Sequence, residues 1–179
     1  MESHLESDLK PHLDLACVKL ETRTFIWKIE AFSEVLRRSR NGEILSIGSS
    51  PFYTDRTESY GYKIKVKMFP NGQGRGVNTH LSVLIVVMKG DYDAILPWPF
   101  KKKVKLTLID QQKNLDTERE NFTRQFITDN HPCFARPTQE DGGTGRGYAD
   151  FISHEALHKR HYIVDDTLFL QVEVGPLSS

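Results

Sequence analysis

Cysteine is scarce in this sequence, with Cys17 and Cys133 the only two among 179 residues. Two thiols are too few for a disulfide framework or for a zinc site built from four thiolates. A chain of this length buries a core without such crosslinks, so we expect one domain with a short appendage. We expect both cysteines to be free thiols in a reducing compartment and the protein to be cytoplasmic.

Long apolar runs and an excess of one charge are also missing. No run approaches the ~20 apolar residues of a membrane-spanning helix, and the first residues lack the charged and apolar regions of a signal peptide. The 24 basic and 24 acidic residues balance, so no net field draws the protein to nucleic acid or to an anionic membrane. We therefore expect no nucleic-acid partner and no membrane insertion.

The segment at 79–90, THLSVLIVVMKG, is apolar on both of its alternating faces. One face would carry Leu81, Val83, Ile85 and Val87, and the other would carry Leu84, Val86 and Met88. A strand with one solvated face alternates apolar and polar residues, so this strand should be covered on both sides or expose an apolar surface. The cover for the second face would have to be a helix, a loop or a partner, and because the chain offers no helix long enough, we expect a partner.

The clearest alternation lies just before this segment, in YGYKIKVKMF at 60–69. Its even positions from Tyr62 to Met68 are apolar and should face inward, and the lysines between them form a ladder on the outer face. NGQGRGVN at 71–78 has the turn chemistry of a hairpin, so the two strands should be antiparallel neighbours. A phosphate-binding loop is disfavoured because a strand, rather than a helix, follows these glycines.

Similar patterns predict the remaining elements. Strands are expected within 24–29, 44–54 (two short strands separated by Pro51), 101–111, 139–151 (a short edge strand) and 165–174, with short helices at 31–38 and 154–162. About eight short strands with few and brief helices indicate an all-β fold, an antiparallel sandwich of two sheets. The pattern does not specify the topology.

Residues 1–23 follow a different period from the rest of the chain. Leu9, Leu13, Ala16 and Leu20 recur at spacings of four, three and four, which is the seam of a short helical coil. Pro11 should disturb any helix before it. Two interpretations stay open on this pattern, a frayed tail and the end of a longer oligomerising coil. We divide the chain into a linker or coil end at 1–23 and a domain at 24–179.

The histidines near the C-terminus are the only candidate metal ligands with helical spacing. His154, His158 and His161 recur at four and three residues, which on a helix would bring imidazoles together. No acidic or thiol third ligand falls at an obvious spacing, and the adjacent Lys159 and Arg160 would repel a cation. We expect no metal and no cofactor.

Candidate catalytic groups are equally isolated. Cys133 follows His131 closely, but no third group completes a nucleophile motif. Asp165 and Asp166 precede a predicted strand, where they suit turn amides or a pair with Arg160 better than general acid–base work. We therefore predict that the chain is not an enzyme.

A series of motifs in order along the chain resembles the C-terminal receptor-binding domain of the TRAF (TNF receptor-associated factor) adaptor family, part of the wider MATH fold. The motifs are FxWKI at 25–29, SPFYT at 50–54, YGYKIKV at 60–66, NGxGxG at 71–76, THLS at 79–82, VVMKGDYDAILPWPF at 86–100, LxLIDQ at 106–111 and YIVDDTLFL at 162–170. The resemblance covers roughly residues 24 to 174. It implies an eight-stranded antiparallel sandwich that forms homotrimers above a coiled coil, whose last turns would carry Leu9, Leu13, Ala16 and Leu20.

The family binds short linear peptides by adding them as a strand to a sheet edge, and the resemblance implies which residues would do so here. The implied edge strand carries Gly145, Arg146, Gly147 and Tyr148. The other implied peptide contacts are Lys67 for an acidic side chain, Phe69, Gln73 in the turn, Leu84 as an apolar floor, Phe126, and His131, Pro132 and Cys133 in the place of a run of serines.

Several of these positions depart from the family pattern. Lys67 offers a point charge where an arginine would bind a carboxylate bidentately, and Phe69 lacks the hydroxyl of the usual tyrosine. Pro132 has no hydroxyl and Cys133 is a weak donor. Arg146 stands where one branch of the family has an aromatic residue.

The resemblance implies a noncatalytic signalling adaptor domain that binds acidic-containing peptides of receptor cytoplasmic tails or signalling proteins. An alternative is a substrate-recognition MATH domain of a ubiquitin-pathway adaptor or protease, which would take serine-rich peptides. A sugar-binding or small-molecule sandwich enzyme is a third class, and it would need a polar pocket with a metal or a carboxylate pair.

Overall fold

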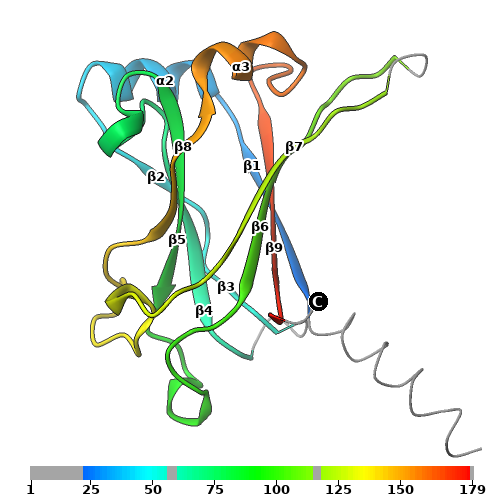
Figure 1. The fold of residues 1–179 in the computed structure, drawn as a ribbon. Helices are drawn as coiled ribbons and strands as arrows, with labels where there is room; N and C mark the ends of the chain where they lie inside the picture. Colours follow the sequence, from blue (N-terminus) through cyan, green and yellow to red (C-terminus); the bar gives the residue numbers. More distant parts are fainter. Residues whose placement is uncertain (1–21, 56–59, 115–117, 178–179) are drawn as a thin grey trace, which may run out of the picture.

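The computed structural model describes residues 22–55, 60–114 and 118–177, which form two antiparallel sheets with two short helices at the same end of the molecule (Figure 1). The strands are β1 (Arg23–Ile29), β2 (Ile47–Gly48), β3 (Phe52–Tyr53), β4 (Lys63–Phe69), β5 (His80–Met88), β6 (Lys103–Leu108), β7 (Phe122–Ile127), β8 (Arg146–Ser153) and β9 (Leu168–Gly175). The helices are α2 (Phe32–Arg40) and α3 (His154–Lys159), with single 3₁₀ turns at Gly74–Gly76, Asp93–Ile95 and Pro132–Phe134. The predicted coil seam at Leu9, Leu13, Ala16 and Leu20 lies outside the described residues.

One sheet has the strand order β1-β9-β6-β7, and the other has the order β2-β4-β5-β8 with β3 also paired to β4. β2 pairs with Met68 and Lys67, and β3 pairs with Ile64 and Lys63. Both short strands therefore lie along the side of β4 that β5 leaves free, interrupted where Pro51 has no N–H to donate. If β2 and β3 are counted as one interrupted strand, each of the two described sheets has four strands. This confirms the predicted eight-stranded sandwich.

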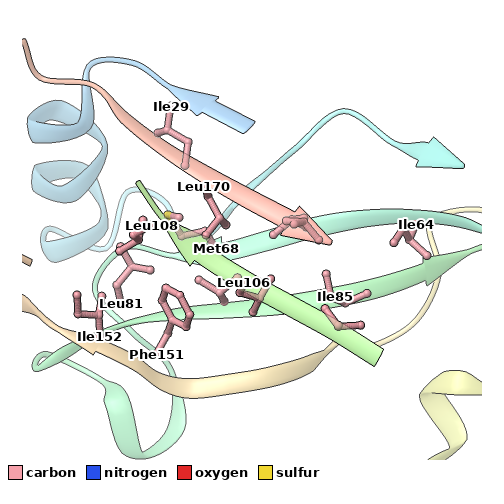
Figure 2. Packing of buried hydrophobic residues seen from close by; sticks show 14 of the residues in the cluster. Ile29, Ile64, Met68, Leu81, Ile85, Leu106, Leu108, Phe151, Ile152 and Leu170 are labelled. Atoms are coloured by element: carbon pink, nitrogen blue, oxygen red, sulfur yellow. The ribbon is translucent and has the colours of Figure 1, made fainter. Parts of the chain in front are cut away.

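The core lies between the two sheets, where the alternating residues of β4, β6 and β9 meet (Figure 2). Ile64 and Met68 from one sheet face Leu106 and Leu170 from the other, and all four are fully buried. The period-two prediction for these strands is confirmed, and the lysines of β4 lie on the opposite, outer face. Burial of this apolar area is the main favourable term in folding.

β5 is buried on both faces within the single chain. Its inward residues belong to the core, and its outward residues Leu84, Val86 and Met88 are only 7%, 2% and 7% exposed. The lysines of β4 stand directly opposite these three side chains, and a Cβ placed on Gly145 would lie 2.9 Å from Val86 Cγ2. The expectation that a partner covers this face is therefore wrong, because lysine stems and the glycine-rich segment 142–147 cover it.

β8 contains a bulge opposite Ser82, the one polar residue inside β5. Leu81 pairs with Ile152 and Val83 pairs with Tyr148, so residues 149–151 oppose Ser82 alone. The Ser82 hydroxyl donates to the Ala149 carbonyl (2.6 Å) and accepts from the Gln73 N–H (2.9 Å), and its side chain is fully buried. Ser82 thereby joins the β4–β5 connection to β8.

We predict that Ser82→Ala lowers the free energy of unfolding by about 1–3 kcal/mol, because the Gln73 N–H and the Ala149 carbonyl both lose their partner. Urea denaturation followed by circular dichroism measures the change. The control is Ser50→Ala at an exposed position, which should stay within about 0.5 kcal/mol of the native chain. Equal stability of the two variants would show that the hydroxyl does not hold the bulge.

Candidate functional site

A cavity of about 340 Å³ opens beside β8, which is the outermost strand of its sheet. It is lined by Gln73, Leu84, Phe126, Ile127, Asp129, Phe134, Gly145, Arg146, Gly147 and Ala149. Six of these were predicted from the sequence to contact a peptide, namely Gln73, Leu84, Phe126, Gly145, Arg146 and Gly147. The structure therefore brings together residues from the β4–β5 connection, β5, β7 and β8.

Apart from Arg146, the side of the cavity formed by β8 and the residue before it has only the small residues Gly145, Gly147 and Ala149. A Cβ on Gly147 would lie 2.2 Å from the Val83 carbonyl oxygen and 3.0 Å from Leu84 Cα, so only glycine allows β8 to pair this closely. Ala149 continues the same small face. Gly145, Gly147 and Ala149 therefore present little more than backbone to the cavity, and Leu84 lies on its floor.

Tyr148 points to the other side of β8 and contacts the opposite sheet. Its ring meets the Phe126 ring edge-on, with 5.7 Å between centroids, and its hydroxyl donates to the Gln125 carbonyl. Tyr148 was predicted as a peptide contact, but it does not line the cavity. Its position instead holds β8 against β7 beside the cavity.

The cavity also contains an ion pair that the sequence reasoning missed. Arg146 Nη2 lies 3.0 Å from Asp129 Oδ2, and the other oxygen of Asp129 accepts the His131 N–H at 3.0 Å. The His131 N–H, together with the positive charge of Arg146, holds the pKa of Asp129 below its usual value. An aspartate whose carboxylate accepts the N–H two residues later is a common turn signal, and it could have identified Asp129 as a turn residue from the sequence.

Lys67 and Phe69 lie on the outer face of β4, next to the cavity but not in its lining. Lys67 is directly opposite Leu84 in the β4–β5 ladder, and its ammonium group lies 5.3 Å from the Phe69 ring centroid. This cation–π contact holds the ammonium group over an aromatic face. Lys67 is thus the cationic group closest in the ladder to the floor of the cavity.

The three residues at 131–133 do not share the main cavity. His131 Nδ1 accepts the Cys133 N–H at 3.2 Å, and Pro132 begins a 3₁₀ turn. Pro132 and Cys133 line a neighbouring cavity of about 150 Å³ with Val87 and Gly142. Burial raises the pKa of the Cys133 thiol, which disfavours the thiolate that a nucleophile requires.

The remaining sequence candidates have structural partners. His154 Nε2 lies 2.9 Å from the Pro70 carbonyl, and His158 Nδ1 lies 2.7 Å from the carbonyl of His154. Asp166 accepts both the N–H and the hydroxyl of Ser33, which caps the start of α2. Within residues 22–55, 60–114 and 118–177, no cluster of three histidine, cysteine or acidic side chains is placed to hold a metal, and no helix is long and apolar enough to cross a membrane.

Comparison with known proteins gives consistent matches. The model of the TRAF/meprin MATH domain matches residues 44–171. The chain is 39% identical over 152 residues to TNF receptor-associated factor 5 of Mus musculus, and 39% identical over 151 residues to TNF receptor-associated factor 1 of Homo sapiens. Each match covers 83% of this chain, but the chain spans only 26% and 34% of the two relatives.

A solved structure agrees with these matches. The chain superimposes on Notothenia coriiceps TRAF5 with a TM-score of 0.79 and 32% sequence identity. The match covers 98% of this chain and 92% of that chain.

We predict that Gly147→Ala lowers the free energy of unfolding by about 1–3 kcal/mol, because the added methyl group meets the β5 backbone. Gly143→Ala is the matched control, since its methyl group would have no atom within 4 Å. Chemical denaturation compares the two variants. Equal loss of stability, or none in either variant, would contradict the close approach of β8 to β5.

Proposed function

The chain belongs to the TRAF/meprin MATH-domain family, and from this premise we propose that it is a noncatalytic signalling adaptor domain that binds short, acidic-containing peptides by strand addition to β8. The observation that supports the proposal most is the glycine-lined edge strand beside an apolar floor at Leu84. The unpaired groups of an edge strand supply affinity for an extended peptide, and pockets next to it supply selectivity. The peptides would come from receptor cytoplasmic tails or signalling partners, so we place the protein in the cytoplasm.

The preference for an acidic side chain follows from the charges around the cavity. Arg146 is already paired with Asp129, so its charge is partly neutralised. Among the described residues, Lys67 contacts the ring of Phe69 and pairs with no acidic side chain, and it stands beside Leu84. We therefore assign recognition of a peptide carboxylate to Lys67.

We predict that Lys67→Glu weakens binding of a glutamate-containing peptide at least about 10-fold, because a like charge replaces the attractive one. Lys63→Glu is the matched control, since it makes the same change on the same face of β4 but opposite Met88. Titration calorimetry with receptor-tail peptides measures both variants. Undiminished affinity of Lys67→Glu, or an equal loss in Lys63→Glu, would reject Lys67 as the acidic contact.

A substrate-recognition MATH domain is the second candidate function within the same fold. It would take serine-rich peptides without acidic residues along the same edge. A peptide array scored for its dependence on glutamate and on serine separates the two candidates. The similarity to TNF receptor-associated factors favours the adaptor.

We also propose that the chain forms homotrimers through the leucine seam before the domain, at Leu9, Leu13, Ala16 and Leu20. Affinity at one shallow edge site is expected to be weak, because an extended peptide loses entropy on ordering. Three linked sites would raise the apparent affinity for clustered tails by ~10²- to 10⁴-fold.

Light scattering of residues 1–179 is expected to give a trimer, or a concentration-dependent equilibrium between monomer and trimer. Leu13→Asp should shift it to the monomer, because a charge in the seam is desolvated on association. Asp14→Asn, one residue outside the seam, is the control and should leave the mass unchanged. A monomer at high concentration for the native chain would contradict the proposed trimer.

A further inference from the structure

The bulge in β8 leaves carbonyl groups that do not pair with β5. Side chains from two other strands donate hydrogen bonds to them. Ser82 of β5 donates to the Ala149 carbonyl. Arg124 of β7 donates through Nη1 to the carbonyls of Asp150 and Phe151, the second at 3.4 Å. Every carbonyl of residues 149–151 therefore already has a side-chain donor.

Arg124 is held in this position by further contacts. Its guanidinium carbon lies 3.9 Å from the centroid of the Tyr148 ring, and its Nη1 lies 3.6 Å from Asp150 Oδ1. The side chain is 32% exposed, so it is partly desolvated between the two sheets. A planar guanidinium suits this site because it can stack on a ring and donate to several oxygens together.

Arg124 comes from β7, the outermost strand of the opposite sheet, and reaches β8, the outermost strand of its own. The side chain therefore crosses the open side of the sandwich where an added strand would have to lie. Residues 145–147 line the cavity on one side of this bridge, and residues 150–151 lie under it. The edge of β8 is thus divided into an accessible part and a covered part.

We propose that Arg124 sets the end of the β8 edge that can accept a strand, so that a bound peptide runs along residues 145–148 and leaves the sheet there. This proposal rests on the proposed peptide-binding function and adds a limit on peptide length. A longer peptide would have to displace a donor from carbonyls that are already satisfied, which exchanges hydrogen bonds without a net gain. Arg124 acts as a positioning residue for the peptide terminus.

The test compares peptides of two lengths on the native chain and on Arg124→Met, which keeps an unbranched side chain but removes the donors. The core peptide has five residues and contains glutamate, and two further peptides extend it by five threonine and valine residues at one end or the other. Fluorescence anisotropy measures each affinity. We expect extension to change the native affinity by less than about 2-fold, and one extension to tighten binding to Arg124→Met by about 5-fold or more.

The matched control is Arg75→Gln, which removes the other guanidinium that pairs with Asp150 but leaves the edge carbonyls covered. Extension of the peptide should change the affinity of Arg75→Gln as little as it changes that of the native chain. If the role of Arg124 were purely structural, Arg124→Met would bind the core peptide and the extended peptides more weakly by the same factor. The dependence of affinity on peptide length therefore separates a structural role from a limit on peptide length. If Arg124→Met does not fold by circular dichroism, Arg124→Gln replaces it with a shorter side chain that cannot bridge to both carbonyls.

The two levels of the proposal fail in different ways. If the core peptide binds and extension helps the native chain as much as Arg124→Met, the limit set by Arg124 is rejected and the binding function stands. If the core peptide binds neither protein, the binding function is rejected, and sedimentation without peptide decides the role of Arg124. An uncovered edge pairs with other chains, so Arg124→Met should then self-associate beyond the native chain, and identical sedimentation would overturn the proposal.

Discussion

The hydroxyl of Ser82 is the constraint on which the geometry of the site depends. It is the one polar residue inside β5, and it bonds to the β4–β5 connection on one side and to the β8 bulge on the other. Because the bulge places three residues opposite one, it turns the carbonyls of Asp150 and Phe151 toward Arg124. The accessible part of β8 ends where this arrangement begins, and the cavity lies beside the part that remains.

The features predicted correctly from the sequence are those set by local patterns. Alternation identified the buried face of β4 because side chains in a strand point to opposite sides in turn, and Asn71 with Gly72 marked the connection to β5. Pro51 marked the break that makes β2 and β3 one interrupted strand position. Clustered glycines indicated the edge strand, since a backbone that must approach another closely has no room for a Cβ.

The features that were missed depend on contacts between distant segments. The sequence of β5 predicts that a partner covers its apolar outer face. The lysine stems of β4 and the glycines of 142–147 lie over this face instead, and the residues of β5 contain no signal for these neighbours. Arg124 and Asp129 gave no signal that they would meet β8, since their partners follow only from the pairing of β8 with β5 and the packing of β7 against it. A bulge has no sequence code of its own, and its register appears only when both strands are in place.

The charges in the site limit which side chain can select an acidic peptide. The pKa of Asp129 is lowered by the His131 N–H and by Arg146, so this carboxylate is ionised at neutral pH and stays paired with Arg146. A peptide carboxylate that approached Arg146 would meet the charge of Asp129 at the same time, which reduces the attraction. Within the part of the chain that the structure describes, Lys67 lies over the Phe69 ring and pairs with no acidic side chain, so its charge remains available beside Leu84. Selectivity for an acidic residue in the proposed complex therefore depends on Lys67, on the β4 side of the cavity. β8 contributes backbone pairing, and Arg124 limits the length of peptide that can pair with it.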